Sequence, residues 1–163
     1  MQTVYIETSI VSFLRENPLA ASDSVQRQKT TRLWWDFHRH RYGLVTSQYV
    51  IDEASTGNIV LVTERLQYRA GIPLVPLSEQ IDRLAAEIVS RAILPADAIV
   101  DALYIASAAV NRVDYLLTWN CKHIANPMTL PRVFRTLDDF GLPFPVICTP
   151  REMADEYDYE TTP

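Results

Sequence analysis

Glycine is scarce in this chain, with four glycines among 163 residues. Neither GxGxxG nor GxxxxGK followed by Ser or Thr occurs, so the glycine-rich loops that hold nucleotide phosphates are missing. Cysteine is also rare, because Cys121 and Cys148 are the two present. Histidine is hardly commoner, and His38 and His40 lack the spacing of zinc ligands.

Long apolar runs are absent as well. No stretch approaches the ~18 apolar residues that a membrane-spanning helix requires. Residues 1–5 lack the positively charged and apolar regions of a secretory signal peptide. Two cysteines are typical of a reducing compartment, where a disulfide is not expected. We therefore expect a cytoplasmic protein with no membrane partner.

Positive charge is not in excess either. The chain has 15 Lys and Arg residues against 20 Asp and Glu residues, which gives a formal net charge of −5. Because non-specific binding of nucleic acid depends on basic side chains that neutralise phosphates, this balance counts against a simple binding module. It counts less against a metal-dependent nuclease, whose cations offset the charge of its own acids. The basic residues cluster between Arg27 and Arg41.

Hydrophobic residues, in contrast, make up 48% of the chain. This composition and length predict one globular domain, residues 1–163, with a sizeable core. β-branched runs alternate with segments of helical periodicity, which predicts a parallel sheet covered by helices on both faces. The predicted strands are 3–6, 44–46, 71–76, 114–118 and 145–148. The predicted helices are 10–14, 22–41, 47–55, 59–70, 78–89, 95–111, 121–126, 130–140 and a short one from 149.

The predicted helix 22–41 carries Trp34, Trp35 and Phe37. Adjacent tryptophans cannot both face one narrow stripe of a regular helix, and Trp is common in interface hot spots. A partner contact and full burial within the monomer are equally good interpretations.

Two polar residues lie at the carboxyl ends of predicted strands. Glu7 comes after the strand 3–6, and Asn120 follows the strand 114–118. Sites in parallel sheets form beyond the carboxyl ends of strands, so we expect these two side chains to lie together. Taken alone, Glu7 suits the first turn of a helix, and Asn120 suits a helix cap.

Two further acids lie within predicted helices. Asp101 interrupts an apolar stretch, 98–110, in which a carboxylate needs compensation. Asp97, one turn earlier, is the expected N-cap of that helix. Glu53 and Asp52 point ~100° apart, and the apolar neighbours of Glu53 place it on the buried side. The alternative for Glu53 is a surface glutamate paired with an arginine.

Together these side chains are the oxygen ligands that a hard divalent cation prefers. We expect Glu7 and Asp101 to bind such a metal directly, and Glu53 to hold a metal-bound water or act as general base. Asn120 would orient water or a ligand without adding charge. Arg15, Lys122 or residues of the basic segment 27–41 would contact a phosphate backbone.

The same segments resemble the PIN-domain family, in particular the VapC-like toxins of bacterial toxin–antitoxin systems. The resemblance spans nearly the whole chain and depends on the order and spacing of short pieces. These pieces are Tyr5-Ile-Glu-Thr-Ser9, Glu53 on a helix, Asp101-Ala-Leu-Tyr-Ile-Ala-Ser-Ala108 and Leu116-Leu-Thr-Trp-Asn120, followed by Lys122-His-Ile124.

The resemblance implies a three-layer α/β/α sandwich with a central parallel sheet of four to five strands. It also implies Mg²⁺ or Mn²⁺ and hydrolysis of RNA. The family's acids fall on Glu7, Glu53 and Asp101, its fourth position on Asn120, and polar residues lining the cleft on Ser9 and Thr118. The implied partners are RNA, a small antitoxin protein and a second copy in a homodimer.

Two positions depart from the family pattern. Glu7 stands where the first acid is usually Asp, and its extra methylene moves the carboxylate outward by ~1 Å, which matters for the tight octahedral shell of Mg²⁺. His123 stands where many members carry a further acid, and imidazole suits Mn²⁺ better than Mg²⁺. Three other functions therefore stay open: a member that binds RNA or a partner without cutting, a hydrolase of small phosphate esters, and a non-enzymatic module.

Overall fold

The protein has an α/β fold around a four-stranded, all-parallel sheet. The computed structural model describes residues 1–15, 17, 19–91 and 94–154. The strands lie in the order β2-β1-β3-β4. Their bounds are Thr3–Ile6 for β1, Gly43–Val45 for β2, Tyr115–Leu117 for β3 and Val146–Cys148 for β4. The predicted fold class is confirmed, with four strands.

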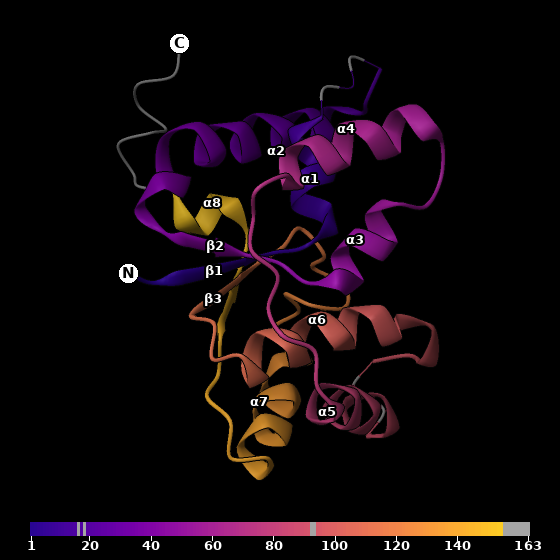
Figure 1. Ribbon diagram of the computed structural model, residues 1–163, viewed down its shortest axis with the longest axis vertical. Helices are drawn as coiled ribbons and strands as arrows, with labels where there is room; N and C mark the ends of the chain where they lie inside the picture. Colours follow the sequence, from indigo (N-terminus) through magenta and orange to yellow (C-terminus); the bar gives the residue numbers. More distant parts are fainter. Residues whose placement is uncertain (16, 18, 92–93, 155–163) are drawn as a thin grey trace.

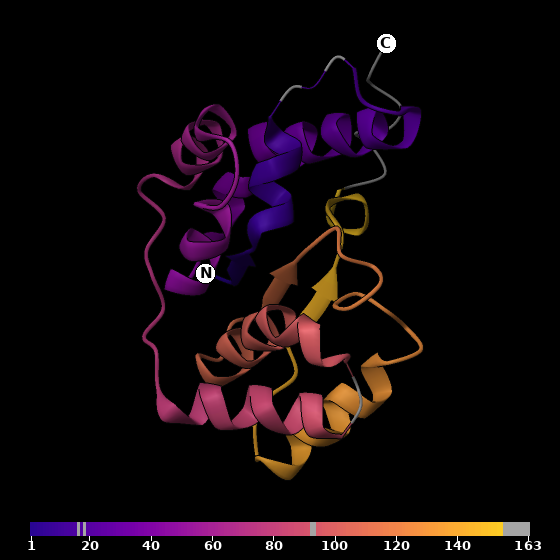
Figure 2. The ribbon, with the colours of Figure 1, turned by 90° about the vertical axis from the view of Figure 1, so that its right-hand side faces the viewer.

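Of the five predicted strands, the one at 71–76 is wrong. This segment makes one isolated bridge to the sheet, between Leu74 and Thr46. Pro73 and Pro76 have no backbone N–H to donate, so a ladder cannot extend in either direction. The segment instead runs along the β2 edge from one layer of helices to the other (Figure 2).

Helices cover both faces of the sheet, which gives three layers (Figures 1 and 2). One face carries α1 (Thr8–Leu14), α2 (Ser22–Leu33), α4 (Ile59–Arg69) and α8 (Pro150–Met153). The other face carries α5 (Glu79–Ser90), α6 (Ile99–Val110) and α7 (Leu130–Asp139). The short α3 (Gln48–Ala54) follows β2 and contacts both α4 and α6.

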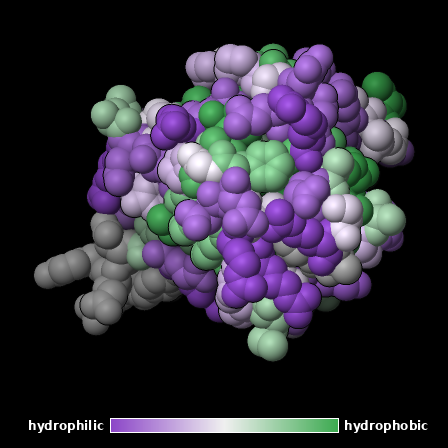
Figure 3. Space-filling model, turned by 90° about the horizontal axis from the view of Figure 1, so that it is seen from below, coloured by the Kyte–Doolittle hydropathy of each residue, from purple (hydrophilic) through white to green (hydrophobic). Residues whose placement is uncertain are grey.

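Successive side chains of the central strands point alternately into two hydrophobic cores, one on each face of the sheet. Tyr5 and Leu116 point into the core under α5, α6 and α7. Val4, Ile6 and Leu117 point into the core under α1 and α2. All five side chains are at most 1% exposed, as expected for strands covered on both faces. The outer surface over α5 and α7 is largely hydrophilic, with small apolar patches (Figure 3).

The predicted helix 22–41 is helical throughout but changes its pitch. After α2 comes a π-helical turn, η1 (Trp34–His38), and then a 3₁₀ turn, η2 (Arg39–Arg41). The wider π turn changes the angle between successive side chains, and both Trp34 and Trp35 are buried. Burial within the monomer is therefore the correct interpretation of the tryptophan pair, whereas Phe37 is exposed.

Residues 121–126, predicted to be a helix, form turns instead. The carbonyl of Asn120 accepts hydrogen bonds from the backbone N–H groups of both Ile124 and Ala125, at 3.1 and 2.8 Å. These bonds close the segment into a compact loop that does not propagate as a helix. Across the described residues, no helix is both long and apolar enough to cross a bilayer.

Candidate active site

The sheet has a crevice where its connections diverge. The chain leaving β1 enters α1 and α2 on one face, while the chain leaving β3 reaches α7 on the other face. Because β1 and β3 are neighbours, the space beyond their carboxyl ends is a switch point, where ligands bind in open α/β sheets. Glu7 follows β1 and Asn120 follows β3 by three residues.

A pocket of about 340 Å³ lies at this edge. It brings together five of the predicted site residues from four parts of the chain. Those five are Glu7, Ser9, Glu53, Asp101 and Asn120, and the other lining residues are Thr8, Ser12, Phe13, Thr56 and Arg65.

Glu7 is held tightly at the floor of the pocket. Its side chain is the N-cap of α1, where Oε1 accepts a hydrogen bond of 2.9 Å from the backbone N–H of Ser9. The Ser9 hydroxyl donates to the same oxygen and accepts a bond of 2.8 Å from the N–H of Trp119. Ser9 therefore ties the end of β1 to the segment after β3, and Glu7 Oε2 takes no part in this clamp.

Burial raises the pKa of Glu7 from 4.5 to about 7, although the two hydrogen bonds from Ser9 oppose the shift. The negative charges of Glu53 and Asp101 raise this pKa further. Glu7 is 3% exposed. A buried carboxyl beside two other acids is costly to ionise, and a nearby cation would remove that cost.

Asp101 lies in the first turn of α6 and has two neighbours from the loop after β3. Its Oδ2 is 3.0 Å from Nδ1 of His123, and the Asn120 side chain lies beside it. Burial raises the pKa of Asp101, while the contacts with His123 and Asn120 lower it. Asn120 Oδ1 accepts a hydrogen bond of 2.9 Å from the backbone N–H of His123, so Asn120 orders the loop whose His123 contacts the aspartate.

The prediction that Asp97 caps this helix is wrong. Pro95 starts a 3₁₀ turn, η3 (Ala96–Ala98), and Ala98 occupies the N-cap position of α6 without a side-chain bond. Asp97 is exposed within that turn. Its charge still raises the pKa of Asp101, so it contributes electrostatically to the site.

Glu53 faces the pocket from the last turn of α3, while its neighbour Asp52 is exposed, as predicted. The buried Tyr104 of α6 neighbours Glu53, and its hydroxyl is hydrogen-bonded to the Thr8 hydroxyl at 2.9 Å. Burial raises the pKa of Tyr104, and the charges of Glu53 and Glu7 raise it further. Tyr104 is therefore a neutral hydroxyl beside the acids, a place in the site that the apolar stretch around it did not indicate.

Arg65 is a basic residue in the wall of the pocket, and it was not among the residues predicted from the sequence. It lies in the middle of α4, and its Nη1 donates to the carbonyls of Ala54 and Thr56 at 3.5 and 3.0 Å. A positive charge there suits the negative end of α3. No local pattern singles out Arg65, because its position depends on how α4 packs against α3.

The remaining predicted contacts lie away from the pocket lining. Arg15 forms an ion pair of 2.6 Å with Glu64 and lines a neighbouring hollow. Lys122 is exposed on the loop after Asn120. Thr118 is fully buried, and its hydroxyl accepts a 2.9 Å bond from the N–H of Asn120. Thr118 therefore supports the site from behind.

The donor chemistry of the pocket fits a hard divalent cation. Three carboxylates line it, and the pKa of Glu7 is raised in part by the other two. In the described part of the chain, no three His, Cys, Asp or Glu side chains converge closely enough to form a ready-made metal cage. Mg²⁺ does not need one, because it keeps several waters and binds through one or two carboxylates.

A larger hollow, of about 550 Å³, lies at the C-terminal end of α4. It is lined by aromatic and basic side chains, including Trp35, Tyr68 and Arg39. The carboxylates that general acid–base or metal chemistry would require lie in the smaller pocket, which is therefore the candidate site. Comparison with protein-family models, with curated proteins and with solved structures gives no match to this chain.

Proposed function

We propose that this protein is a metal-dependent endoribonuclease of the PIN type, which cuts single-stranded or structured RNA. The observation that carries the proposal is the gathering of Glu7, Glu53, Asp101 and Asn120 in one pocket. These residues come from four separate segments, and they are the ones that the resemblance assigns to the active site.

Glu7 and Asp101 would bind Mg²⁺ or Mn²⁺ directly, and Glu53 would hold the ion through a bound water. When bound, the ion would lower the pKa of a water and offset charge on the phosphate. Ser9 leaves Glu7 Oε2 outside its clamp, since its hydrogen bonds go to Oε1. His123 contacts Oδ2 of Asp101. The chain thus orients both carboxylates in advance, which is how active sites hold their ligands.

Glu53 is our choice for the general base. It is half-buried in the last turn of α3 and lines the pocket beside Tyr104. A carboxylate so placed accepts a proton from an attacking water within hydrogen-bond reach. On the same wall, Arg65 would bind a non-bridging oxygen of the phosphate and stabilise its growing charge.

The biological setting follows from the same resemblance. We propose that the protein is the toxin of a toxin–antitoxin pair, active in the cytoplasm as a homodimer. An antitoxin protein would then control access to the pocket.

A second function is favoured by a specific observation. Glu7 Oε1 and Asp101 Oδ2 are already engaged by Ser9 and His123. If these contacts persist in the presence of metal, fewer carboxylate oxygens are left for it. The protein would then be a PIN-like domain that binds RNA or a protein partner without cleavage.

The test is cleavage of an end-labelled RNA pool by the purified protein with Mn²⁺, with Mg²⁺ and with chelator. Asp101→Asn removes a ligand charge while keeping the shape, so we expect it to abolish cleavage. Asp52→Asn is the matched control, because it makes the same change on an exposed residue outside the pocket. Cleavage retained by Asp101→Asn contradicts the mechanism. RNA binding without cleavage under either metal supports the second function.

A further inference from the structure

The acid pocket adjoins a second hollow at Phe13. This residue of α1 lines the acid pocket together with Ser12, and both residues also line a hollow of about 240 Å³ between α1 and α2. A chain that enters the acid pocket therefore has a surface to follow on the α2 side. Phe13 is partly exposed, so its ring is within reach of such a chain.

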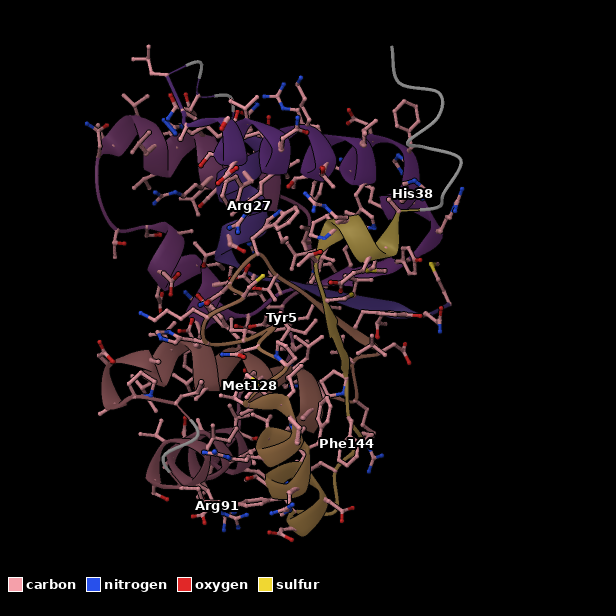
Figure 4. The ribbon with its side chains drawn as sticks, turned by 180° about the vertical axis from the view of Figure 1, so that it is seen from behind. Tyr5, Arg27, His38, Arg91, Met128 and Phe144 are labelled. Carbon is pink, nitrogen blue, oxygen red and sulfur yellow. The ribbon has the colours of Figure 1, made fainter. Side chains whose placement is uncertain are left out.

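Arg27 of α2 lies over the same aromatic ring. Its Cζ atom is 5.8 Å from the ring centroid of Phe13 and 5.3 Å from that of Trp119. The two rings meet edge to face, with their centroids 6.1 Å apart. Figure 4 shows Arg27 on the side of α2 that faces the sheet.

Trp119 makes this arrangement rigid. Its indole Nε1–H donates to the Thr31 hydroxyl at 2.7 Å, and its backbone N–H donates to Ser9 at 2.8 Å. The side chain of Trp119 is almost completely buried. Because Ser9 also holds Glu7, the position of Arg27 is coupled to the acid pocket through a chain of fixed contacts.

Arg27 has no acidic partner among the described residues. In the part of the chain that the structure describes, no carboxylate forms an ion pair with it, whereas Arg15 pairs with Glu64, and Arg91 with Glu87 and Asp139. A guanidinium that stacks on aromatic rings keeps its N–H donors for a phosphate. Three acids in the pocket repel an RNA backbone, so nearby cations are needed to hold it.

We propose that single-stranded RNA enters the acid pocket over Phe13 and Arg27. Phe13 stacks on a base, and Arg27 binds the phosphate next to the scissile one. Together they form a binding site, called here the Phe13–Arg27 platform. Aromatic rings combined with basic side chains are the usual means of holding single strands without reading their sequence. This inference deepens the proposed function and depends on it for the identity of the ligand.

The test separates binding from cutting. A fluorescent single-stranded RNA oligonucleotide is titrated with full-length protein in chelator, and anisotropy is recorded over a range of salt concentrations. We expect Arg27→Ala to weaken binding about tenfold and to reduce the slope of log K against log salt by about 0.7, the value for one phosphate contact on a single strand. Arg135→Ala, the same change at an exposed position of α7, should leave the affinity and the salt slope unaltered.

Phe13 is tested by shape and aromaticity. Phe13→Leu keeps an apolar side chain of similar volume but removes the ring face. We expect it to weaken binding by roughly five- to 150-fold, the range for loss of one stacked base, without changing the salt slope. Phe13→Tyr should restore the affinity, which a purely structural role for the side chain does not explain. Thermal unfolding monitored by circular dichroism confirms that each variant is folded.

The outcomes distinguish this inference from the proposed function. If the wild-type protein cuts RNA while Arg27→Ala and Phe13→Leu bind as it does, the strand takes another path and the platform is refuted. If the protein binds RNA through both residues but never cuts, the platform stands and the ribonuclease proposal fails. The platform is also overturned if the wild type does not bind single-stranded RNA. The same holds if an acidic peptide binds through Arg27 more tightly than the RNA does.

Discussion

Glu7 allows a quantitative prediction from its burial. Its pKa is 4.5 in the unfolded chain and about 7 in the folded protein, so the folded state binds a proton more tightly. The contribution to stability is complete below pH 4.5 and is lost as the pH rises through about 7. The two pKa values differ by about 2.5. Because a difference of one corresponds to about 1.4 kcal/mol, the loss is about 3 kcal/mol.

The assay is urea denaturation in chelator at a series of pH values from about 4 to 8, for the wild type and for Glu7→Gln. Glutamine has the same shape, its amide oxygen still accepts the bonds from Ser9, and it does not ionise. We expect the free energy of unfolding of Glu7→Gln, relative to the wild type, to rise by about 3 kcal/mol across this range. Titrating groups far from Glu7 behave alike in both proteins and cancel in the difference, which leaves Glu7 and the acids coupled to it.

Parallel stability curves for the two proteins would refute the reasoning, since they would mean that Glu7 ionises equally easily in the folded and unfolded states. Glu79→Gln, an exposed acid in α5, is the control and should follow the wild-type curve. If the proposed metal binds, Mn²⁺ should stabilise the wild type more than Glu7→Gln above pH 7. A concentration of 100 times the Kd adds about 2.7 kcal/mol.

Three further predictions concern the neighbours of the acids. Tyr104→Phe removes the hydroxyl next to Glu53 and leaves the Thr8 hydroxyl without its partner, so we expect about 1–2 kcal/mol less stability in urea and a lower kcat. Unchanged kcat would show that Tyr104 does not orient Glu53. Arg65→Ala exposes two carbonyls at the end of α3 and should cost about 1–3 kcal/mol, with Arg65→Lys recovering part of it. His123→Ala should weaken Mn²⁺ binding about tenfold to 100-fold in calorimetry, as loss of an outer partner does; equal affinity would contradict its role.

The polar residues at strand ends were the most predictable part of the site. Glu7 and Asn120 follow hydrophobic runs, and a parallel sheet brings such positions to one edge. Asp101 and Glu53 were found because a carboxylate among apolar residues requires compensation. Each of these signals lies within a few residues of the side chain concerned.

The contacts between these residues were not predictable. The bond between His123 and Asp101 joins positions 22 apart, and that between Thr8 and Tyr104 joins positions 96 apart. Arg65 reaches the pocket because α4 packs on α3. The helix predicted at 121–126 from local sequence was wrong, because the hydrogen bonds to the Asn120 carbonyl close this segment into a loop.

The sequence by itself determined the class of fold and the chemical character of the site, because both depend on short-range periodicity and residue type. Alternating strands and helices specified a parallel sheet, and the side chains at the strand ends and in the helices beside them gave the site its carboxylate and amide oxygens. Only the tertiary structure decided which acid is buried, which is paired and which cation faces them. Those properties depend on distances and burial between segments far apart in the chain, as the raised pKa of Glu7 beside Glu53 and Asp101 demonstrates.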